Sequence, residues 1–292
     1  EMAKKLGLFF FALGFLMVGL NVLQAQTELD QFVYLPLIVV SDGTPEITPT
    51  VSATLTATPT HTAIPTPTLT PQAGIPAGSK ILPLGDSRVQ GSRPEYESYR
   101  YELWKNLIDN GWSFDFVGQR TDGASYDDYL GQPFDTDHEG TSGATTTDIL
   151  NTLSAYQNNP NSPSFDVVLL GIGGNDLIQF ADAADVFDRI NQIIDELQTL
   201  NPNVVIFVEQ IAPGLSILTP PNLMDQYEAY NADIATLATA QTDGSSTVIV
   251  IDMTDGWSDA YLADPVHYNA AGAKFIADKY DAALEAFYST DQ

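Results

Sequence analysis

The chain contains no cysteine among its 292 residues. Disulfide bonds and thiolate metal sites are therefore excluded. The fold must be stabilised by burial, and a hydrophobic content of 44% is ordinary for a globular core. The length is sufficient for one large domain or two small ones.

Basic residues are also scarce, because only 11 Lys and Arg face 38 Asp and Glu, which gives a net charge of −27. A charge of this sign and size argues against nucleic acid or an anionic membrane surface as partner, and a neutral substrate fits best. Solubility outside the cell is the simplest role for this acidity, with adaptation to salt as the open alternative.

The N-terminus carries a targeting pattern, in which Lys4 and Lys5 precede the 15-residue apolar run Leu6–Leu20. With a small residue at Ala25, this layout predicts a secretory signal peptide over residues 1–25, and hence a secreted protein. A retained membrane anchor is the competing interpretation, although the run is shorter than the roughly 20 apolar residues that a membrane-spanning helix needs.

Two further segments precede the region that can form a core. Residues 26–43 include the short apolar stretch 32–40, interrupted by Pro36, which is either a short strand or a surface-association element. Residues 44–78 are rich in Thr, Pro and Ala without apolar periodicity, which predicts an extended linker, open to O-glycosylation. Attachment to the cell surface through this stalk is left open.

From residue 79 to residue 292 the pattern alternates between strands and helices, which predicts one domain with a doubly wound α/β fold. In such folds the site lies at the carboxyl ends of the parallel strands. Strands are expected at residues 80–84, 113–117, 165–170, 204–208 and 248–251, and helices at 99–110, 147–156, 182–200, 225–239 and 270–287.

The turn Gly85-Asp86-Ser87 follows the first expected strand directly. A glycine permits a tight turn there, and the start of the next helix can present amides to a developing negative charge. Ser87 is thus a candidate nucleophile. An ordinary strand-to-helix turn capped by Asp or Ser is the alternative.

The loop 171–176 follows the central apolar strand and is rich in glycine. It fails as a dinucleotide fingerprint, because Asp176 stands where that motif needs Gly, so no cofactor is expected. The uncharged side-chain amide of Asn175 suits an oxyanion hole instead.

Histidines are few, and this scarcity narrows the choice of a general base. Of the three, His61 lies in the linker, which leaves His138 and His267. Asp264 precedes His267 by three residues, a spacing that lets the carboxylate orient the imidazole and stabilise its protonated form. A surface histidine at a helix cap is the alternative for His267.

His138 lies between two carboxylates and could be read as a metal ligand, but no second histidine is spaced to complete a site. A structural histidine that ties down its loop is the favoured interpretation, and no metal is expected. Nearby Gly143 precedes a helix and can offer its backbone amide as a second oxyanion donor.

Taken in order, residues 85–87, Gly143, residues 173–176 and residues 264–267 resemble the four sequence blocks of the SGNH (GDSL-type) hydrolase superfamily. The resemblance covers about residues 80–287. It implies a flavodoxin-like three-layer α/β/α sandwich with a five-stranded parallel sheet.

The same resemblance implies roles for individual residues in a serine esterase. Ser87 would be the nucleophile, His267 the base and Asp264 its orienting acid. The amides of Ser87 and Gly143 and the side chain of Asn175 would form the oxyanion hole.

Residues 138–143, 98–100 and 114–118 further resemble the carbohydrate-esterase branch that includes family 3 acetylxylan esterases. This likeness implies an acetylated polysaccharide as substrate. The alternatives are a lipase or thioesterase for longer acyl chains, and a carbohydrate-binding module in which Trp104, Trp112 or Trp257 forms a sugar platform.

Two positions depart from the family pattern. Arg88 follows the nucleophile where Leu or Ile is usual, and Thr141 replaces a usual His or Pro. Arg88 and the nearby Arg93 are expected to pair with Glu95 and Glu97, with recognition of an acidic sugar as the alternative.

Overall fold

The computed structural model describes residues 74–179, 181–242 and 245–289. The expected signal peptide, the segment 26–43 and all but the last residues of the expected linker lie outside these residues. Within the described ranges, no helix is both long and apolar enough to cross a membrane.

Seven strands of the described residues form one sheet, in the order β3-β4-β1-β5-β6-β7 with β2 paired to β1. All pairings are parallel except that of β3 with β4. The strands are β1 (Ser79–Gly85), β2 (Phe114–Phe116), β3 (Arg120–Thr121), β4 (Asp137–Gly140), β5 (Val167–Gly171), β6 (Val205–Gln210) and β7 (Thr247–Asp252).

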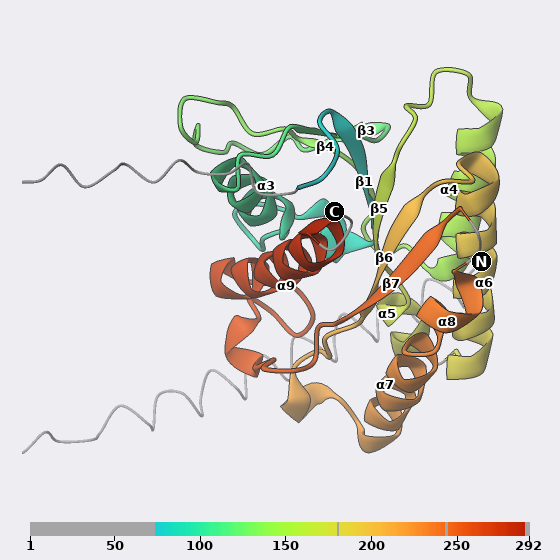
Figure 1. The fold of residues 1–292 in the computed structure, drawn as a ribbon. Coiled ribbons are helices and arrows are strands. Elements are labelled where there is room, and N and C mark those ends of the chain that lie inside the picture. The colour runs from blue at the N-terminus through green and yellow to red at the C-terminus, as the bar shows by residue number, and fades with distance from the viewer. Residues whose placement is uncertain (1–73, 180, 243–244, 290–292) are drawn as a thin grey trace, which may run out of the picture. The chain divides into compact units, whose positions relative to one another are not determined.

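Helices cover both faces of this sheet (Figure 1), which confirms the predicted three-layer α/β/α class. Helices α3 and α9 lie on one face, and α4, α6, α7 and α8 lie on the other. The helices are α2 (Ser87–Gln90), α3 (Arg100–Asp109), α4 (Thr146–Asn158), α5 (Gly174–Ile178), α6 (Ala183–Leu200), α7 (Pro221–Ile234), α8 (Leu237–Gln241) and α9 (Ala270–Ser289), with short 3₁₀ turns η1 (Ser216–Leu218) and η2 (Asp259–Tyr261).

The central strands are apolar on both faces, as parallel strands between two helical layers require. Successive residues of β5 point to opposite sides, so Val168 and Leu170 join the core beneath α4 and α6, while Val167 and Leu169 join the core beneath α3 and α9. All four side chains are fully buried.

The five expected strands are present, and β3 and β4 extend the sheet beyond them. The helix expected over residues 225–239 is two helices, α7 and α8, and α7 begins earlier, at Pro221. Proline fits this position because the first turn of a helix leaves its backbone N–H groups unpaired.

Two of the three tryptophans belong to the core. Trp104 and Trp112 are 4% and 9% exposed, so neither offers an open ring face to a sugar. Trp257 is partly buried against Tyr261, Tyr268 and Phe275.

Candidate active site

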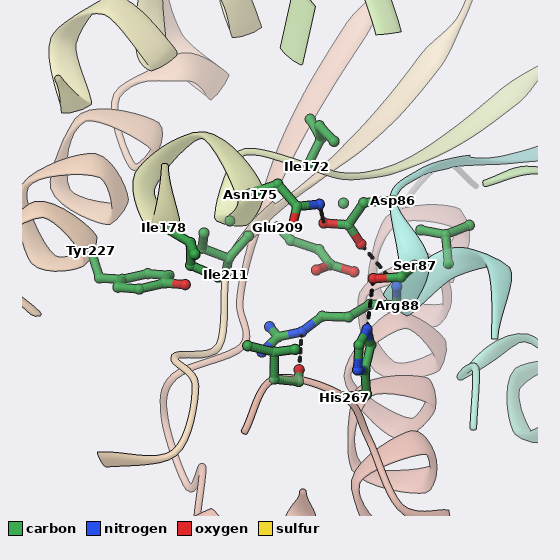
Figure 2. A pocket seen from close by; sticks show the side chains of 14 residues that line it. Asp86, Ser87, Arg88, Ile172, Asn175, Ile178, Glu209, Ile211, Tyr227 and His267 are labelled. Carbon is green, nitrogen blue, oxygen red and sulfur yellow. Dashed lines mark hydrogen bonds between the residues drawn. The ribbon is translucent and has the colours of Figure 1, made fainter. Parts of the chain in front are cut away.

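The motif residues gather at the carboxyl ends of β1 and β5 and in the loop before α9 (Figure 2). Close approach of the two strands depends on glycine. Gly85 lies opposite Gly171 in the sheet, and a Cβ atom on Gly85 would lie 2.0 Å from the Gly171 carbonyl oxygen. A side chain at Gly85 would therefore push β1 away from β5 and displace the turn that follows.

Ser87, His267 and Asp264 form a continuous hydrogen-bonded chain. His267 Nε2 lies 2.9 Å from Ser87 Oγ, and His267 Nδ1 lies 2.6 Å from Asp264 Oδ2. A hydroxyl, an imidazole and a carboxylate linked in this way can move the hydroxyl proton to the imidazole while the carboxylate stabilises the resulting charge.

Asp264 is held as a carboxylate by its own loop. Its Oδ1 accepts the backbone N–H groups of Val266 and His267, each at 2.8 Å. Partial burial opposes ionisation, but the hydrogen bonds from the His267 side chain and from these two amides lower the pKa of Asp264 to about 2. Asp264 is therefore charged across the neutral pH range and fixes the orientation of the imidazole.

Asp86 caps the short helix α2 behind the serine. Its Oδ1 accepts the Arg88 backbone N–H at 2.9 Å, and its Oδ2 lies 3.4 Å from Asn175 Nδ2. Burial is the main cause of a raised Asp86 pKa, which the Arg88 charge and amide partly oppose. Asp86 therefore couples the serine turn to the α5 loop.

Three groups point to an oxyanion site beside Ser87. Within the described residues, the backbone N–H groups of Ser87 and Gly143 have no protein acceptor. Asn175 Nδ2 donates to the Ala144 carbonyl at 2.9 Å and makes the longer contact with Asp86. If the contact with Asp86 breaks, the second N–H of the Asn175 side chain becomes available to a ligand.

The loop that carries Gly143 is held by two hydrogen bonds to the residues around Ser87. The amide of Thr141 donates to the Gly85 carbonyl at 3.0 Å, and the amide of Ser142 donates to Gln90 Oε1 at 2.6 Å. Gly143 has a φ of 75°, a left-handed conformation that favours glycine.

Asp176, the last residue of the Gly-rich loop, holds the start of α4 in place. Its carboxylate accepts both the amide and the hydroxyl of Thr146, at 2.9 and 2.7 Å, and forms an ion pair with Arg189. It thereby sets where the Gly143 loop ends and the helix begins.

The expected pairing of the two arginines is wrong for Arg88. Arg93 pairs with Glu97 at 2.6 Å, as expected. Arg88 instead donates to the backbone carbonyls of Ala212, Pro213 and Val266, because its side chain runs under the serine turn rather than toward the surface acids.

His138 is separate from the serine site. It is 2% exposed, and its Nδ1 accepts the Gly140 backbone N–H at 2.9 Å. Burial, aided by the positive charge of Arg100, lowers the pKa of His138 to about 3, so the imidazole is neutral and ties β4 together. Within the described residues, no group of three or more His, Cys, Asp or Glu side chains could hold a metal ion.

Tyr96 contacts His267, although no sequence pattern predicts this contact. Its ring stacks on the His267 ring with centroids 3.8 Å apart and planes inclined by 14°. The tyrosine comes from the segment before α3, and the backbone hydrogen bond from the Glu97 N–H to the Tyr268 carbonyl ties that segment to the residue after His267.

Glu209, at the end of β6, is the second residue that sequence reasoning missed. It is 4% exposed and accepts the Tyr280 hydroxyl at 2.7 Å. Burial raises the pKa of Glu209 to about 7, although the Tyr280 hydrogen bond and the Arg88 charge oppose this. Glu209 lines the same cavity as Ser87.

The cavity beside Ser87 is small, with a volume of about 30 Å³. Three isoleucine side chains form part of its apolar wall, and Tyr227 and His267 also line it (Figure 2). A long acyl chain would not fit inside this enclosed part of the site and would have to extend out of it. The isoleucines are Ile172, Ile178 and Ile211.

Comparison with known proteins places the chain in a family. A sequence model of the GDSL-like Lipase/Acylhydrolase family matches residues 84–275. No curated protein matches the chain.

Solved structures agree with the family match. A family 3 carbohydrate esterase from Clostridium thermocellum is 31% identical, with a TM-score of 0.56, over 72% of this chain and 99% of that one. A family 3 carbohydrate esterase from Talaromyces cellulolyticus is 27% identical, with a TM-score of 0.61, over 73% of this chain and 100% of that one. An acetyl esterase serine-to-alanine mutant with an acetate ion gives the same values. The chain therefore belongs to the GDSL-like lipase/acylhydrolase family and is a carboxylic ester hydrolase.

Proposed function

We propose that this esterase removes O-acetyl groups from a polysaccharide such as acetylated xylan, with Ser87, His267 and Asp264 as its catalytic triad. One observation carries the proposal: these three residues form a hydrogen-bonded chain, and Ser87 and His267 line a cavity of about 30 Å³. The similarity to family 3 carbohydrate esterases supports an acetylated carbohydrate as substrate.

In the first half of the reaction, Ser87 Oγ attacks the ester carbonyl carbon while its proton passes to His267 Nε2. The carbonyl π electrons move onto the oxygen, which receives hydrogen bonds from the Ser87 and Gly143 amides and from the Asn175 side chain. Collapse of this intermediate breaks the ester C–O bond, and the leaving sugar oxygen takes the proton from His267.

In the second half, water attacks the acetyl-enzyme and gives its proton to His267 Nε2. The new tetrahedral intermediate collapses to acetic acid as the proton on His267 returns to Ser87 Oγ, and the released acid loses its proton to solvent to give acetate. The acidic protein carries a net charge of −27, which favours a neutral polysaccharide over an anionic one at the protein surface.

The N-terminal sequence supports a secreted location for this activity. Residues 1–25 have the layout of a signal peptide, and residues 44–78 have the composition of a linker between the N-terminal segments and the catalytic domain 79–292. Such a placement would expose the esterase to extracellular polysaccharide.

The first experiment is turnover of p-nitrophenyl acetate, butyrate and octanoate by the wild type and by Ser87→Ala. We expect Ser87→Ala to lose nearly all activity, and the wild type to lose kcat/KM sharply beyond propionyl because the cavity is small. A preference for octanoate would favour a lipase. Activity of folded Ser87→Ala equal to wild type would overturn the triad.

The second experiment identifies the substrate class by measuring acetate released from acetylated xylan, pectin and mannan. The largest release is expected from xylan or mannan, because their backbones are neutral.

A fluorophosphonate probe should label Ser87 in the wild type and leave Ser87→Ala unlabelled. Folded wild type that is neither labelled nor active would indicate a carbohydrate-binding module instead.

A further inference from the structure

Arg88 is a partly buried cation for which the proposed reaction has no use. It directly follows Ser87, and its side chain lines the cavity between the serine and Tyr227. Figure 2 shows the side chain running from beside Ser87 and His267 in the direction of Tyr227.

The guanidinium binds backbone rather than acids. Arg88 Nε donates to the Val266 carbonyl at 2.7 Å, and Nη1 donates to the Ala212 carbonyl at 2.6 Å. A longer contact of 3.5 Å joins Nη2 to the Pro213 carbonyl, and the Tyr268 ring lies 4.9 Å below the guanidinium carbon. In the described part of the chain, Arg88 forms no ion pair with a carboxylate.

These acceptors belong to two segments, the loop that carries His267 and the segment that follows β6. Val266 immediately precedes His267, and residues 212–213 follow the end of β6. The two segments also contact one another directly, because the Leu215 amide donates to the Pro265 carbonyl at 2.8 Å. A Cβ on Gly214 would lie 2.7 Å from that same carbonyl oxygen.

His267 lies in a loop, outside α9, so its position depends on such anchors. Asp264 fixes the rotation of the imidazole through Nδ1 but belongs to the same loop. Arg88 instead ties this loop to the helix α2 that begins with Ser87. The guanidinium is planar and presents several N–H donors in fixed directions, which lets it hold two carbonyls at once.

We propose that Arg88 is a positioning residue, which holds the His267 loop at reacting distance from Ser87 through the Val266 and Ala212 carbonyls. The inference rests on the proposed triad. Misplacement of a catalytic group by about 1 Å can cost about 10²-fold in rate, which sets the scale of the expected effect.

The test uses Arg88→Met, which keeps the apolar stem and removes the donors, and Arg88→Lys, which keeps the charge and cannot bind both carbonyls. With p-nitrophenyl acetate we expect kcat to fall about 10–100-fold in Arg88→Met and less in Arg88→Lys. KM should change less than threefold, because the proposed role acts on the position of the His267 loop and not on substrate binding. The rate of fluorophosphonate labelling of Ser87 should fall in parallel with kcat.

A third variant, Arg88→Ala, tests the role by chemical rescue. Ethylguanidinium chloride should restore part of its kcat, because the guanidinium can rebind the vacant carbonyls from the open side of the cavity. Ethylammonium chloride at equal concentration should restore much less. A merely structural loss, measured as a lower melting temperature, would not respond differently to the two ions.

Lys274→Met is the charge-matched control. It makes the same change in net charge, but the Lys274 side chain is 58% exposed and pairs with the exposed Asp278 on α9, with Nζ and Oδ1 2.8 Å apart. Its kcat should stay within about twofold of wild type, as expected for a surface substitution.

The outcomes separate this inference from the proposed function. If Ser87→Ala retains turnover, the triad itself fails. If Ser87→Ala is inactive while folded Arg88→Met or Arg88→Lys keeps the wild-type kcat, the positioning role alone is overturned. If Arg88→Met does not fold, the kcat of Arg88→Lys and the chemical rescue of Arg88→Ala decide. A wild-type kcat in Arg88→Lys together with no rescue of Arg88→Ala by ethylguanidinium would overturn the positioning role.

Discussion

Asn175 has both of its side-chain N–H groups engaged with the protein in the structure. The bond to the Ala144 carbonyl is 2.9 Å, whereas the contact with Asp86 is 3.4 Å and easily replaced. A hydrogen bond to a developing oxyanion is much stronger than this long contact with Asp86. The Asn175 amide can therefore turn its second N–H toward the substrate during the reaction.

We therefore expect Asn175→Ala to lower kcat by about 10²–10³-fold with p-nitrophenyl acetate, as loss of one oxyanion donor does elsewhere. KM should change little, because the bond strengthens only in the transition state. Asn158→Ala, an exposed position at the end of α4, is the control and should match wild type. A loss below threefold in Asn175→Ala would remove Asn175 from the oxyanion site.

At the residue scale, sequence reasoning found groups whose chemistry is specific. Ser87, His267 and Asp264 were predicted from residue type and order, and the structure brings them within hydrogen-bonding distance. The role of Arg88 was missed, because its acceptors lie 124 and 178 positions along the chain. Nearby acids were the partners within the protein that the sequence favoured.

Among the elements, β6 has the clearest consequence for the site. It runs to Gln210, two residues beyond the predicted strand, and so carries Glu209 into the buried layer beside the cavity. The pKa of this carboxyl is raised by burial from 4.5 to about 7. The folded protein therefore binds the Glu209 proton more tightly than the unfolded chain does.

Linkage gives the direction of the resulting pH dependence. The contribution of Glu209 to stability is present in full below pH 4.5 and is lost as the pH rises toward and through about 7. Above that pH the buried charge costs on the order of 3 kcal/mol. Glu209→Gln keeps an acceptor for Tyr280 and cannot ionise, so it should melt higher than wild type at pH 8 and similarly at pH 5.

Thermal melts at the two pH values check this expectation. Glu228→Gln, an exposed position on α7, makes the same change in charge and should show no comparable gain at pH 8. An equal rise in melting temperature in both variants would attribute the gain to net charge. No rise in Glu209→Gln at pH 8 would show that ionisation of the buried Glu209 carboxyl does not destabilise the folded protein.

Element prediction succeeded where the pattern was strong and failed where tertiary contacts decide. The apolar run of β5 predicts a buried strand without ambiguity. The strand β4, which consists of Asp137, His138, Glu139 and Gly140, has no such pattern and forms by pairing with the end of β1. Strand β1 pairs with β2 along its first half and with β4 at its end. No local sequence pattern predicts where the pairing partner changes.

For the whole molecule, the dominant physical feature is the charge of −27. Repulsion among so many carboxylates destabilises the compact state, because unfolding moves the charges apart. Salt weakens the exposed ion pairs most, such as that of Lys274 with Asp278, and such pairs contribute about 0–1 kcal/mol each. Screening of repulsion should therefore outweigh the loss of attraction.

We expect the melting temperature to rise as NaCl increases from about 0.01 to 0.3 M, since the screening length falls from about 30 Å to below 10 Å over this range. Each 1 kcal/mol of added stability should raise the melting temperature by about 2–4 °C for a domain of this size. Choline chloride at equal ionic strength should act alike if screening is the cause, whereas a response to Na⁺ alone would indicate a specific cation site. A melting temperature that stays flat or falls in both salts would mean that the acidic surface does not limit stability, and solubility would then be the simpler explanation for its charge.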